Sequence, residues 1–253
     1  HDIHYHFHEE MNRVDKSIVT KYTFAQKEQA RQNLLVEHVA DERIIVTGNT
    51  VIDALFSIVE KARSVPFCDD ILQQLPFLVH EVPPKIVLVT GHRRENFGHG
   101  FEEICQALYD LSKLHTEVEF VYPVHLNPNV QEPVDRILSN VTNIHLIDPL
   151  DYLPFVKLMD ISYLILTDSG GVQEEAPSLG KPVLLMRDTT ERPEAVAAGT
   201  VQLVGVDRNK IVDAANNLLA DDNAYKQMAK AHNPYGDGLA SKRIRDFLMA
   251  INV

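Results

Sequence analysis

The stretch TDSGGVQEE, residues 167–175, places small, hydroxyl and acidic side chains between a short apolar run and a helix pattern. Glycines let a ligand approach the backbone closely and can adopt positive φ, so that several N–H groups point at one place. The helix that follows carries unpaired donors and partial positive charge at its amino end. Ser169, Gly170 and Gly171 therefore predict a seat for a diphosphate. The alternative is an ordinary strand-to-helix turn in which Ser169 caps the helix.

Glu174 and Glu175 lie in the first turns of the same predicted helix. One carboxylate there suits the helix dipole and needs no further reason. A second carboxylate beside a phosphate seat would repel the ligand unless it binds another group. Vicinal hydroxyls of a sugar are the natural target, because one carboxylate accepts two hydrogen bonds. A phosphate seat with a diol-binding carboxylate suggests a nucleotide or nucleotide sugar.

The stretch GHRREN, residues 91–96, brings an imidazole and two guanidinium groups to the end of another predicted strand. Arginine can clamp a phosphate, and a histidine such as His92 can act as acid, base or hydrogen-bond donor to phosphate. The alternative is a surface turn with solvated arginines.

Two further loops carry similar side chains. The stretch RDTTERPEA contributes Arg187 and Arg192, and there Pro193 also predicts a helix start capped by Thr190. His125, in PVHLNPN, is either a ligand contact or a structural histidine.

These loops follow a regular series of elements. Strands are predicted at 85–91, 117–125, 143–149, 161–169, 181–187 and 199–205, and helices at 100–114, 129–139, 152–159, 172–180 and 207–220. Such alternation is typical of an α/β fold, a Rossmann-like, doubly wound parallel sheet covered on both faces. Ligands of these sheets bind outside the carboxyl ends of the strands, where the candidate loops lie.

The amino-terminal part predicts a strand at 21–26, a helix at 27–39, and a strand and helix at 42–55 with Asn49 or Thr50 as N-cap. The Pro-rich segment 64–84 predicts a loop and a domain boundary. Residues 233–238, NPYGDG, predict a turn before a last helix.

Composition excludes several classes. The formal net charge is −12 over 253 residues, 45% of them apolar, which argues against nucleic-acid and anionic-membrane partners and for a sizeable core. No run reaches the roughly 20 apolar residues of a membrane span. Cys68 and Cys105, both in apolar surroundings, predict buried free thiols, and with no signal peptide visible they favour a cytoplasmic protein.

The opening HDIHYHFHEE places His4, His6 and His8 at strand spacing. Imidazoles on one strand face could meet at a metal, but nothing nearby completes a ligand set. An adventitious, tag-like head is the other interpretation. We expect no metal.

Taken together, VTGNTVIDAL, VTGHRRENFG, PVHLNPNV, DPLDYLPF, TDSGGVQEEAPSLGKPVLLMRDTTERPEAVAAGT and NPYGDG resemble the bacterial non-hydrolysing UDP-N-acetylglucosamine 2-epimerases, from about Glu9 onward. The resemblance implies a fold like the GT-B glycosyltransferases, with two Rossmann-like domains around the substrate. Residues 84–253 would be the carboxyl-terminal, UDP-binding domain, and 1–65 a remnant of the amino-terminal domain with the interdomain segment. It implies interconversion of UDP-GlcNAc and UDP-ManNAc for polysaccharide synthesis, with no cofactor, by a homodimer.

The resemblance assigns substrate contacts to Phe155, Ser169, Gly170, Gly171, Glu175 and Arg192. In it, Ser-Gly-Gly holds the diphosphate, Glu175 the ribose hydroxyls and Phe155 the uracil, while Arg192 and His92 meet the phosphates. The family chemistry is elimination of UDP to an enol-ether-like sugar, then re-addition with inversion at C2. Catalytic roles are implied for His92, which would stabilise the departing UDP, and for Glu9, which would move the C2 proton.

Other positions match or depart from the family pattern. Arg93 and His125 match positions linked to a second, regulatory UDP-GlcNAc, and Leu150 stands where members often have Gln. The family's amino-terminal motifs Gly-Thr-Arg-Pro-Glu, Gly-Asp-Thr and His-Val-Glu-Ala-Gly-Leu-Arg do not occur. We therefore expect this polypeptide to bind UDP without epimerising. The alternatives are a GT-B glycosyltransferase using a UDP-sugar, a hydrolysing epimerase and a non-catalytic UDP-binding fragment.

Overall fold

The computed structural model describes the backbone of residues 7–251 and the side chains of residues 11–251. Two compact units divide the chain, and each is described by itself. The first joins the residues up to 56 with those from 234 onward, and the second spans 57–233.

The second unit is built on a six-stranded parallel sheet in the order β5-β4-β3-β6-β7-β8. Its elements are α4 (Asp69–Gln74), the 3-10 helix η2 (Pro76–Val79), β3 (Lys85–Thr90), the 3-10 helix η3 (Arg94–Asn96), α5 (His99–Leu114), β4 (Val118–Pro123), α6 (Pro128–Leu138), β5 (Ile144–Ile147), α7 (Tyr152–Ile161), β6 (Leu164–Thr167), α8 (Val172–Ser178), β7 (Val183–Leu185), α9 (Pro193–Ala198), β8 (Val201–Leu203), α10 (Arg208–Ala220) and α11 (Asp222–Ala229).

The strand order confirms the predicted doubly wound fold. From β3 the chain moves outward through α5 to β4 and through α6 to β5. It then returns through α7 to β6, on the other side of β3, and continues to β7 and β8. The order therefore reverses between β3 and β6, which is where the loops leave a crevice for ligands in such sheets.

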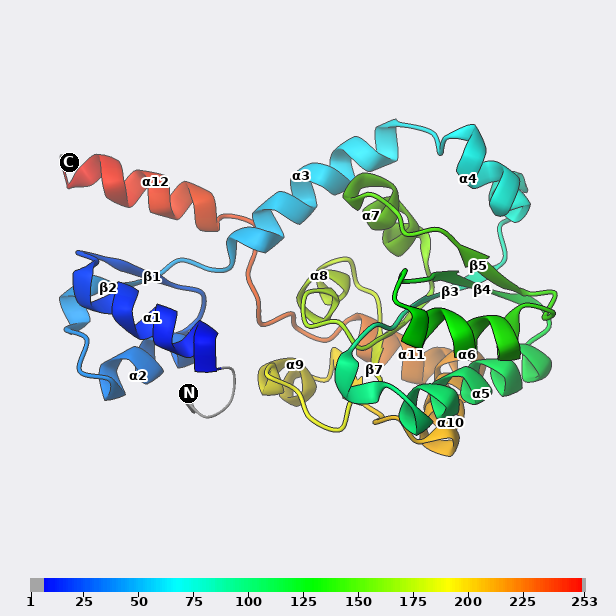
Figure 1. The fold of residues 1–253 in the computed structure, drawn as a ribbon. Helices are drawn as coiled ribbons and strands as arrows, with labels where there is room; N and C mark the ends of the chain where they lie inside the picture. The colour runs from blue at the N-terminus through cyan, green and yellow to red at the C-terminus, as the bar shows by residue number, and fades with distance from the viewer. Residues whose placement is uncertain (1–6, 252–253) are drawn as a thin grey trace. The chain divides into compact units, whose positions relative to one another are not determined.

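Both faces of the sheet are covered, as the apolar strands predict. Val87 and Val89 of β3 belong to a buried cluster with α5, α6 and α10, which Figure 1 shows on one side of the sheet. Ile86 and Leu88 alternate with them and are also buried, so they point to the opposite face, where α7 contacts β3.

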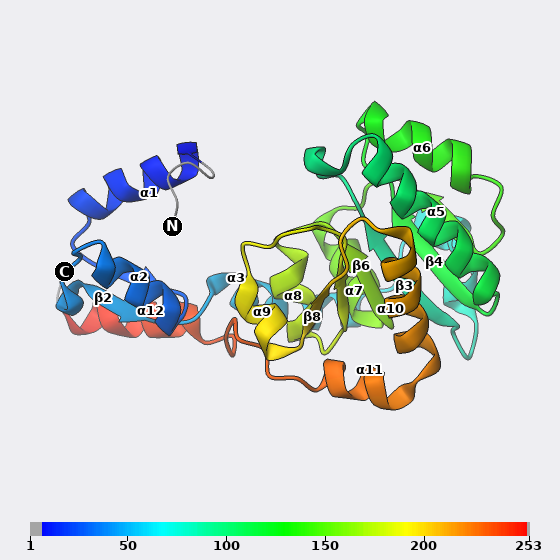
Figure 2. The ribbon, with the colours of Figure 1, turned by 90° about the horizontal axis from the view of Figure 1, so that it is seen from below.

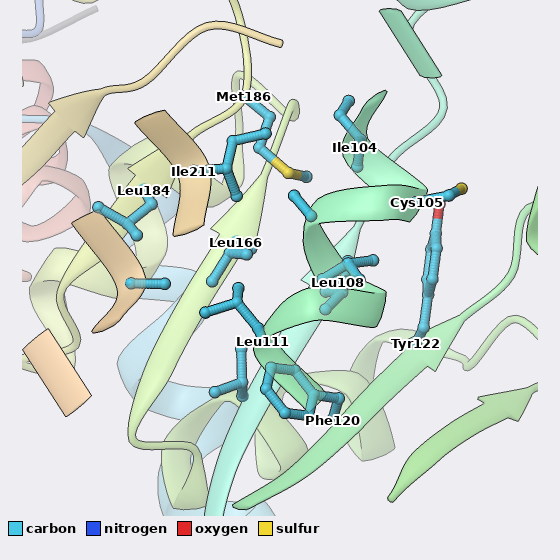
Figure 3. Close-up of a cluster of buried hydrophobic side chains, with 14 of the residues drawn as sticks. Ile104, Cys105, Leu108, Leu111, Phe120, Tyr122, Leu166, Leu184, Met186 and Ile211 are labelled. Atoms are coloured by element: carbon cyan, nitrogen blue, oxygen red, sulfur yellow. The ribbon is translucent and has the colours of Figure 1, made fainter. Parts of the chain in front are cut away.

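Figure 3 shows part of this cluster, with α5 residues packed between Phe120 and Tyr122 of β4 and side chains of β6, β7 and α10. The Tyr122 hydroxyl donates to the carbonyl of Gly91 at 3.1 Å. The core thereby reaches the first residue of the loop after β3, and burial raises the pKa of Tyr122 well above its ordinary value.

Two segments differ from the sequence analysis. The predicted loop 64–84 contains α4 and η2, because Ile71, Leu75 and Phe77 find burial there. Residues 222–229, for which we predicted no element, form α11, and Tyr225 stacks on Tyr163 with ring centroids 3.9 Å apart. Figure 2 shows α11 beside the end of α10, at the bottom of the view.

In the first unit, β1 (Thr23–Ala25) pairs in parallel with β2 (Ile44–Val46). Around this pair lie α1 (Phe7–Val19), α2 (Glu28–Val36), the 3-10 helix η1 (Asp41–Arg43), the start of α3 (Thr50–Ser64) and α12 (Ala240–Ala250). Asn49 caps α3, since its side chain accepts from the Val51 N–H at 3.0 Å.

Helix α12 belongs to the first unit through specific contacts. Phe247 meets the rings of Tyr22 and Phe24 edge-on, at 5.0 and 5.7 Å. Asp53 of α3 accepts hydrogen bonds from the first amides of α12. These units differ from the predicted domains 1–65 and 84–253, in which α12 was grouped with the sheet; that division stays a prediction.

Cys105 is buried, as predicted. Cys68 is exposed, contrary to the prediction, at the position just before α4. Neither forms a disulfide. Within residues 7–251, no helix has the length and apolar character needed to cross a membrane.

Candidate functional site

Asp168 ties together two loops at the point where the strand order reverses. It follows β6 directly and is fully buried. Its Oδ2 accepts hydrogen bonds from the backbone N–H groups of His92 at 2.9 Å and Arg93 at 2.8 Å, and from the side-chain amide of Asn96 at 3.3 Å. Asn96 also donates to the carbonyl of Met186, which fixes the loop after β3 against the ends of β6 and β7.

His92 stands between this carboxylate and a second histidine. Its Nδ1 lies 3.6 Å from Oδ1 of Asp168, and its side chain is 43% exposed. Its ring stacks on that of His125, with centroids 5.5 Å apart and 16° between the planes. One ring face is therefore covered and the Nδ1 edge is turned to an acid. The exposed part of the ring is free to exchange a proton or hydrogen bond with a ligand.

The Ser-Gly-Gly turn begins α8 without the positive φ that we expected of its glycines. Gly171 is the N-cap, with φ −67° and ψ −43°, and Gly170 is likewise not among the positive-φ residues. Ser169 does not cap the helix; its N–H donates to Oγ1 of Thr167 at 2.9 Å. What glycine supplies is room, because a Cβ at position 170 would lie 3.3 Å from Nη2 of Arg93.

Arginines and glutamates pair around this turn. Arg187 is buried and donates to Glu95 and to Glu191, each at 2.6 Å. Arg93 points Nη2 at Glu191 from 3.7 Å, while its buried Nε has no hydrogen-bond partner among the described residues. The loop after β7 is thus held to the loop after β3 by charge.

Arg192, which we expected near the phosphates, forms an ion pair with Glu174. Glu174 is 5% exposed, so its charge is balanced by this arginine as well as by the start of α8. Buried Gln173 links the same elements, since it donates to the carbonyl of Ser169 at 3.2 Å and accepts from Thr190 at 2.7 Å. Thr190 also accepts from the Arg192 N–H at 3.0 Å, the turn expected before α9.

Glu175 is half-buried and accepts a hydrogen bond from the Tyr152 hydroxyl at 3.0 Å. Burial raises the pKa of Glu175, as does the charge of Glu174, while the bond from Tyr152 acts in the opposite sense. Burial, with the nearby Glu175 charge, also raises the pKa of Tyr152. One carboxylate oxygen thus holds a tyrosine, and the other can accept a ligand hydroxyl.

A pocket of about 270 Å³ opens at the carboxyl ends of β3, β4 and β6. Its lining includes His92, His125, Leu150, Phe155, Ser169 and Val172. The structure therefore brings together five residues singled out from the sequence, from the loops after β3, β4, β5 and β6 and from α7. Glu175 and Arg192 do not line this pocket but lie on α8 and just before α9.

Some candidates lie outside the description. Glu9 falls within α1, in the part whose side chains are not described, as does His8, and His4 and His6 precede the described residues. Among the described side chains, no group of three or more His, Cys, Asp or Glu could hold a metal ion.

Comparison with known proteins places this arrangement. A family described as UDP-N-acetylglucosamine 2-epimerase matches residues 1–249. The UDP-N-acetylglucosamine 2-epimerase of Yersinia pestis is 60% identical over 244 residues, which are 96% of this chain and 64% of that protein. The chain belongs to the UDP-N-acetylglucosamine 2-epimerase family. It spans less than two thirds of the length of that relative.

Solved structures agree with this assignment. A Listeria monocytogenes UDP-N-acetylglucosamine 2-epimerase matches with a TM-score of 0.89 and 41% identity, over 99% of this chain and 64% of the other. The Neisseria meningitidis enzyme, in complex with UDP-GlcNAc, matches with a TM-score of 0.86 and 47% identity, over 99% and 67%. The epimerase fold, like that of GT-B proteins, is therefore confirmed.

Sequence reasoning missed Asp168, Asn96 and Gln173 in this member of the epimerase family. All three are buried polar residues, and each makes at least one hydrogen bond to a group more than 15 positions away. One signal was available for Asp168, an acid at the end of an apolar strand and directly before Ser-Gly-Gly. A buried charge in that place requires donors, and such donors come from neighbouring loops at the same sheet edge.

Proposed function

We propose that this chain is the UDP-binding part of an enzyme that interconverts UDP-GlcNAc and UDP-ManNAc. The observation that carries the proposal is one pocket, at the reversal of strand order, lined by His92, Ser169 and Phe155. The apolar end at Phe155 suits a base, and the Ser169 end, beside Arg93, suits a diphosphate. Membership of the epimerase family supports this choice.

The reaction that we propose is an elimination followed by a re-addition. A base takes the proton from C2, the C2–H electrons form the C1–C2 double bond, and the C1–O bond breaks to release UDP. Re-addition of UDP at C1 with protonation of C2 from the other face gives the epimer. His92 would donate to the departing phosphate oxygen, an interaction that strengthens in the transition state.

For the polypeptide of 253 residues we propose UDP binding without turnover. Elimination at C2 needs a base. Among the described residues that line the pocket, only His92 and His125 are ionisable, and the roles proposed for them are at UDP groups, so no lining carboxylate is left for the C2 proton. Glu9, proposed for that proton, lies in the part of α1 whose side chains are not described. Proton NMR in D₂O would show both UDP-ManNAc and deuterium at C2 if turnover occurred, and either signal would contradict this proposal.

The remaining assignments are also proposals. Glu175 would bind the ribose hydroxyls and Arg192 a phosphate after leaving Glu174, while Arg93 and His125 would contact a second UDP-GlcNAc. A glycosyltransferase remains the alternative, and formation of UDP-ManNAc from UDP-GlcNAc without an acceptor by a longer relative carrying this segment would exclude it. The unpaired cysteines are consistent with a cytoplasmic location, and a homodimer would be seen by light scattering.

The decisive test is calorimetric titration of this chain with UDP. Gly170→Val would push a side chain against Arg93 and fill the seat, so UDP affinity should fall about tenfold or more, as expected for lost charge-assisted hydrogen bonds. Ala220→Val is the matched control, because Ala220 is exposed and lies at the opposite end of the sheet from the pocket. The carbonyl of its neighbour Leu219 accepts a hydrogen bond from Lys85, the first residue of β3. Equal affinity of the two variants would contradict the diphosphate seat.

The role of Glu175 has its own ligand comparison. Glu175→Gln should weaken UDP but leave 2′,3′-dideoxy-UDP nearly unchanged, because that analogue lacks the ribose hydroxyls. An equal loss for both ligands would mean that Glu175 acts only through its bond to Tyr152.

A further inference from the structure

Asp168 uses its two oxygens for different purposes. Oδ2 accepts from the backbone of His92 and Arg93 and from Asn96, which is as many donors as one carboxylate oxygen holds comfortably. Oδ1 is buried and has no hydrogen-bond partner among the described residues. Nδ1 of His92 lies 3.6 Å from it. A fully buried carboxylate oxygen without a donor requires an explanation.

We propose that Asp168 is the positioning residue of His92, holding the imidazole with its proton on Nδ1 and its Nε2 toward the ligand. The separation of 3.6 Å exceeds the usual hydrogen-bond range by less than 1 Å, a difference that a small rotation of the His92 side chain would remove. An ionised carboxylate only accepts hydrogen bonds, so Nδ1 must be the donor. The ring then leaves Nε2 for the pocket, because the two nitrogens lie on opposite edges.

Two further contacts restrict the ring. Stacking on His125 limits tilt, and the bond from the His92 N–H to the same carboxylate fixes the backbone from which the ring departs. When Nε2 also carries a proton, the ring can donate from Nε2 to a ligand oxygen while Nδ1 keeps its bond to Asp168. Such a donor suits a departing diphosphate. The chemical purpose of this arrangement therefore rests on the proposed function, whereas its geometry does not.

Exchange of Asp168 for Asn separates the two purposes. The amide oxygen can still accept from the loop donors, and this places the NH₂ group where Oδ1 was. That NH₂ can only donate, so Nδ1 of His92 must become an acceptor and the proton must move to Nε2. The same exchange in serine proteases leaves the geometry intact but selects the wrong tautomer.

The experiment is ¹⁵N NMR of the imidazoles in the 253-residue chain at about pH 9, above the ordinary histidine range. We expect His92 to be mainly the Nδ1–H tautomer in the unchanged protein and mainly Nε2–H in Asp168→Asn. A majority of Nε2–H in the unchanged protein would overturn the proposal, and so would the same tautomer in both proteins.

A matched control exists away from the site. His145 Nε2 lies 2.6 Å from Oε2 of Glu119, on β5 and β4. Glu119→Gln should change the tautomer signals of His145 but not those of His92, and Asp168→Asn should do the reverse. Amide exchange at His92 and Arg93 reports whether the loop bonds survive in Asp168→Asn.

UDP titration gives a second readout. Asp168→Asn should weaken UDP about five- to tenfold, because an amide donor facing Nδ1 prevents the ring from holding protons on both nitrogens and donating to the phosphate as a charge-assisted donor. Unchanged UDP affinity together with the expected tautomer change would remove the role in phosphate binding and overturn that part. Failure of the unchanged protein to bind UDP would contradict the proposed function and leave the tautomer result to decide the positioning role.

Discussion

The two halves of the pocket edge are held in different ways. At the ends of β3 and β6, polar groups bond across from one strand end to the other. Asp168 holds the loop after β3, and Thr90 Oγ1 lies 2.5 Å from Thr167 Oγ1. At the ends of β4 and β5, the side-chain hydrogen bonds of the loops are local. Asn127 accepts from the Asn129 N–H at 2.9 Å and caps α6, and Pro149 and Leu150 shape the pocket wall.

This difference matches the two kinds of ligand group proposed for the two halves. Charged transition-state groups are stabilised best by donors that are already in place and need no reorganisation. The uracil ring needs mainly a shaped apolar wall, which local turns and prolines can supply. The half of the pocket edge at β3 and β6 thus provides preorganised hydrogen-bond donors and charges, and the half at β4 and β5 provides an apolar wall.

Removing the Asp168 side chain should break the comparison most strongly. Asp168→Ala leaves the N–H groups of His92 and Arg93 without acceptors and takes one partner from Asn96. Leaving these part-buried donors unpaired should cost more than is gained by no longer burying a carboxylate, so we expect a loss of about 2–4 kcal/mol in the free energy of unfolding. Urea unfolding measures this, and Asp168→Asn, which keeps an acceptor, should lose much less. Equal losses would contradict the loop-fixing role of Oδ2.

Adding one methyl group should have the next largest effect. A Cβ at Gly91 would lie 3.0 Å from the Tyr122 hydroxyl and 3.3 Å from the Phe101 ring, and both side chains are buried in the core. Neither can move aside cheaply, so Gly91→Ala should cost about 1–3 kcal/mol. Gly171→Ala is the control in urea unfolding, since a Cβ there meets only Oγ of Ser169, at 4.0 Å. If Gly91→Ala loses no more stability than the control, Tyr122 and Phe101 can move aside for the added methyl group.

The sequence predicted the strands, their parallel arrangement and the loops that form the pocket, because short apolar runs and turn residues are local signals. It predicted less well what the charged side chains do. Arg192 and Glu174 pair with each other, and Asp168 acts on a loop 72 to 76 positions away. Such pairings depend on which strands become neighbours, and that order is set by packing of the whole sheet.

The local signals failed in another way at Ser-Gly-Gly. Glycine there was expected to supply positive φ, but the conformation is helical and the useful property is the missing side chain beside Arg93. Composition alone does not distinguish a conformational role of glycine from a spatial one. The φ angle decides between them.

On the locally held half, the effect of mutation should be smaller. Asn127→Ala removes the acceptor for the Asn129 N–H at the start of α6, which should cost about 1 kcal/mol, as for other N-caps. Asn127→Asp, which keeps the cap, should retain the stability in thermal or urea unfolding. The UDP affinity of Asn127→Ala should stay close to that of the unchanged protein if these turns provide shape alone. A loss comparable to that of Asp168→Ala would erase the distinction between the halves.

The smallest expected effect is on the pH dependence of stability, and it concerns two glutamates beside the β3 and β6 half. Their pKa values shift in opposite directions. Burial raises the pKa of Glu175, so the folded chain holds this proton more tightly than the unfolded chain. That contribution to stability is present at low pH and is lost as pH rises from the ordinary value of 4.5 through the folded pKa. Burial would also raise the pKa of Glu191, but its own backbone hydrogen bond and then Arg187 and Arg93 lower it. Its contribution is therefore present above 4.5 and is lost as pH falls.

Glutamine at each position should reveal this opposition. Between about pH 4 and pH 7, Glu175→Gln should gain stability relative to the unchanged protein as pH rises, because it removes a carboxyl that resists ionisation. Glu191→Gln should lose relative stability over the same range, because it removes a charge held between two arginines. Each difference should stay below about 1 kcal/mol, since both side chains retain contact with solvent. Urea unfolding at several pH values measures both. Parallel slopes would mean that solvent screens Arg93 and Arg187 from Glu191, and that charge pairing does not hold this edge.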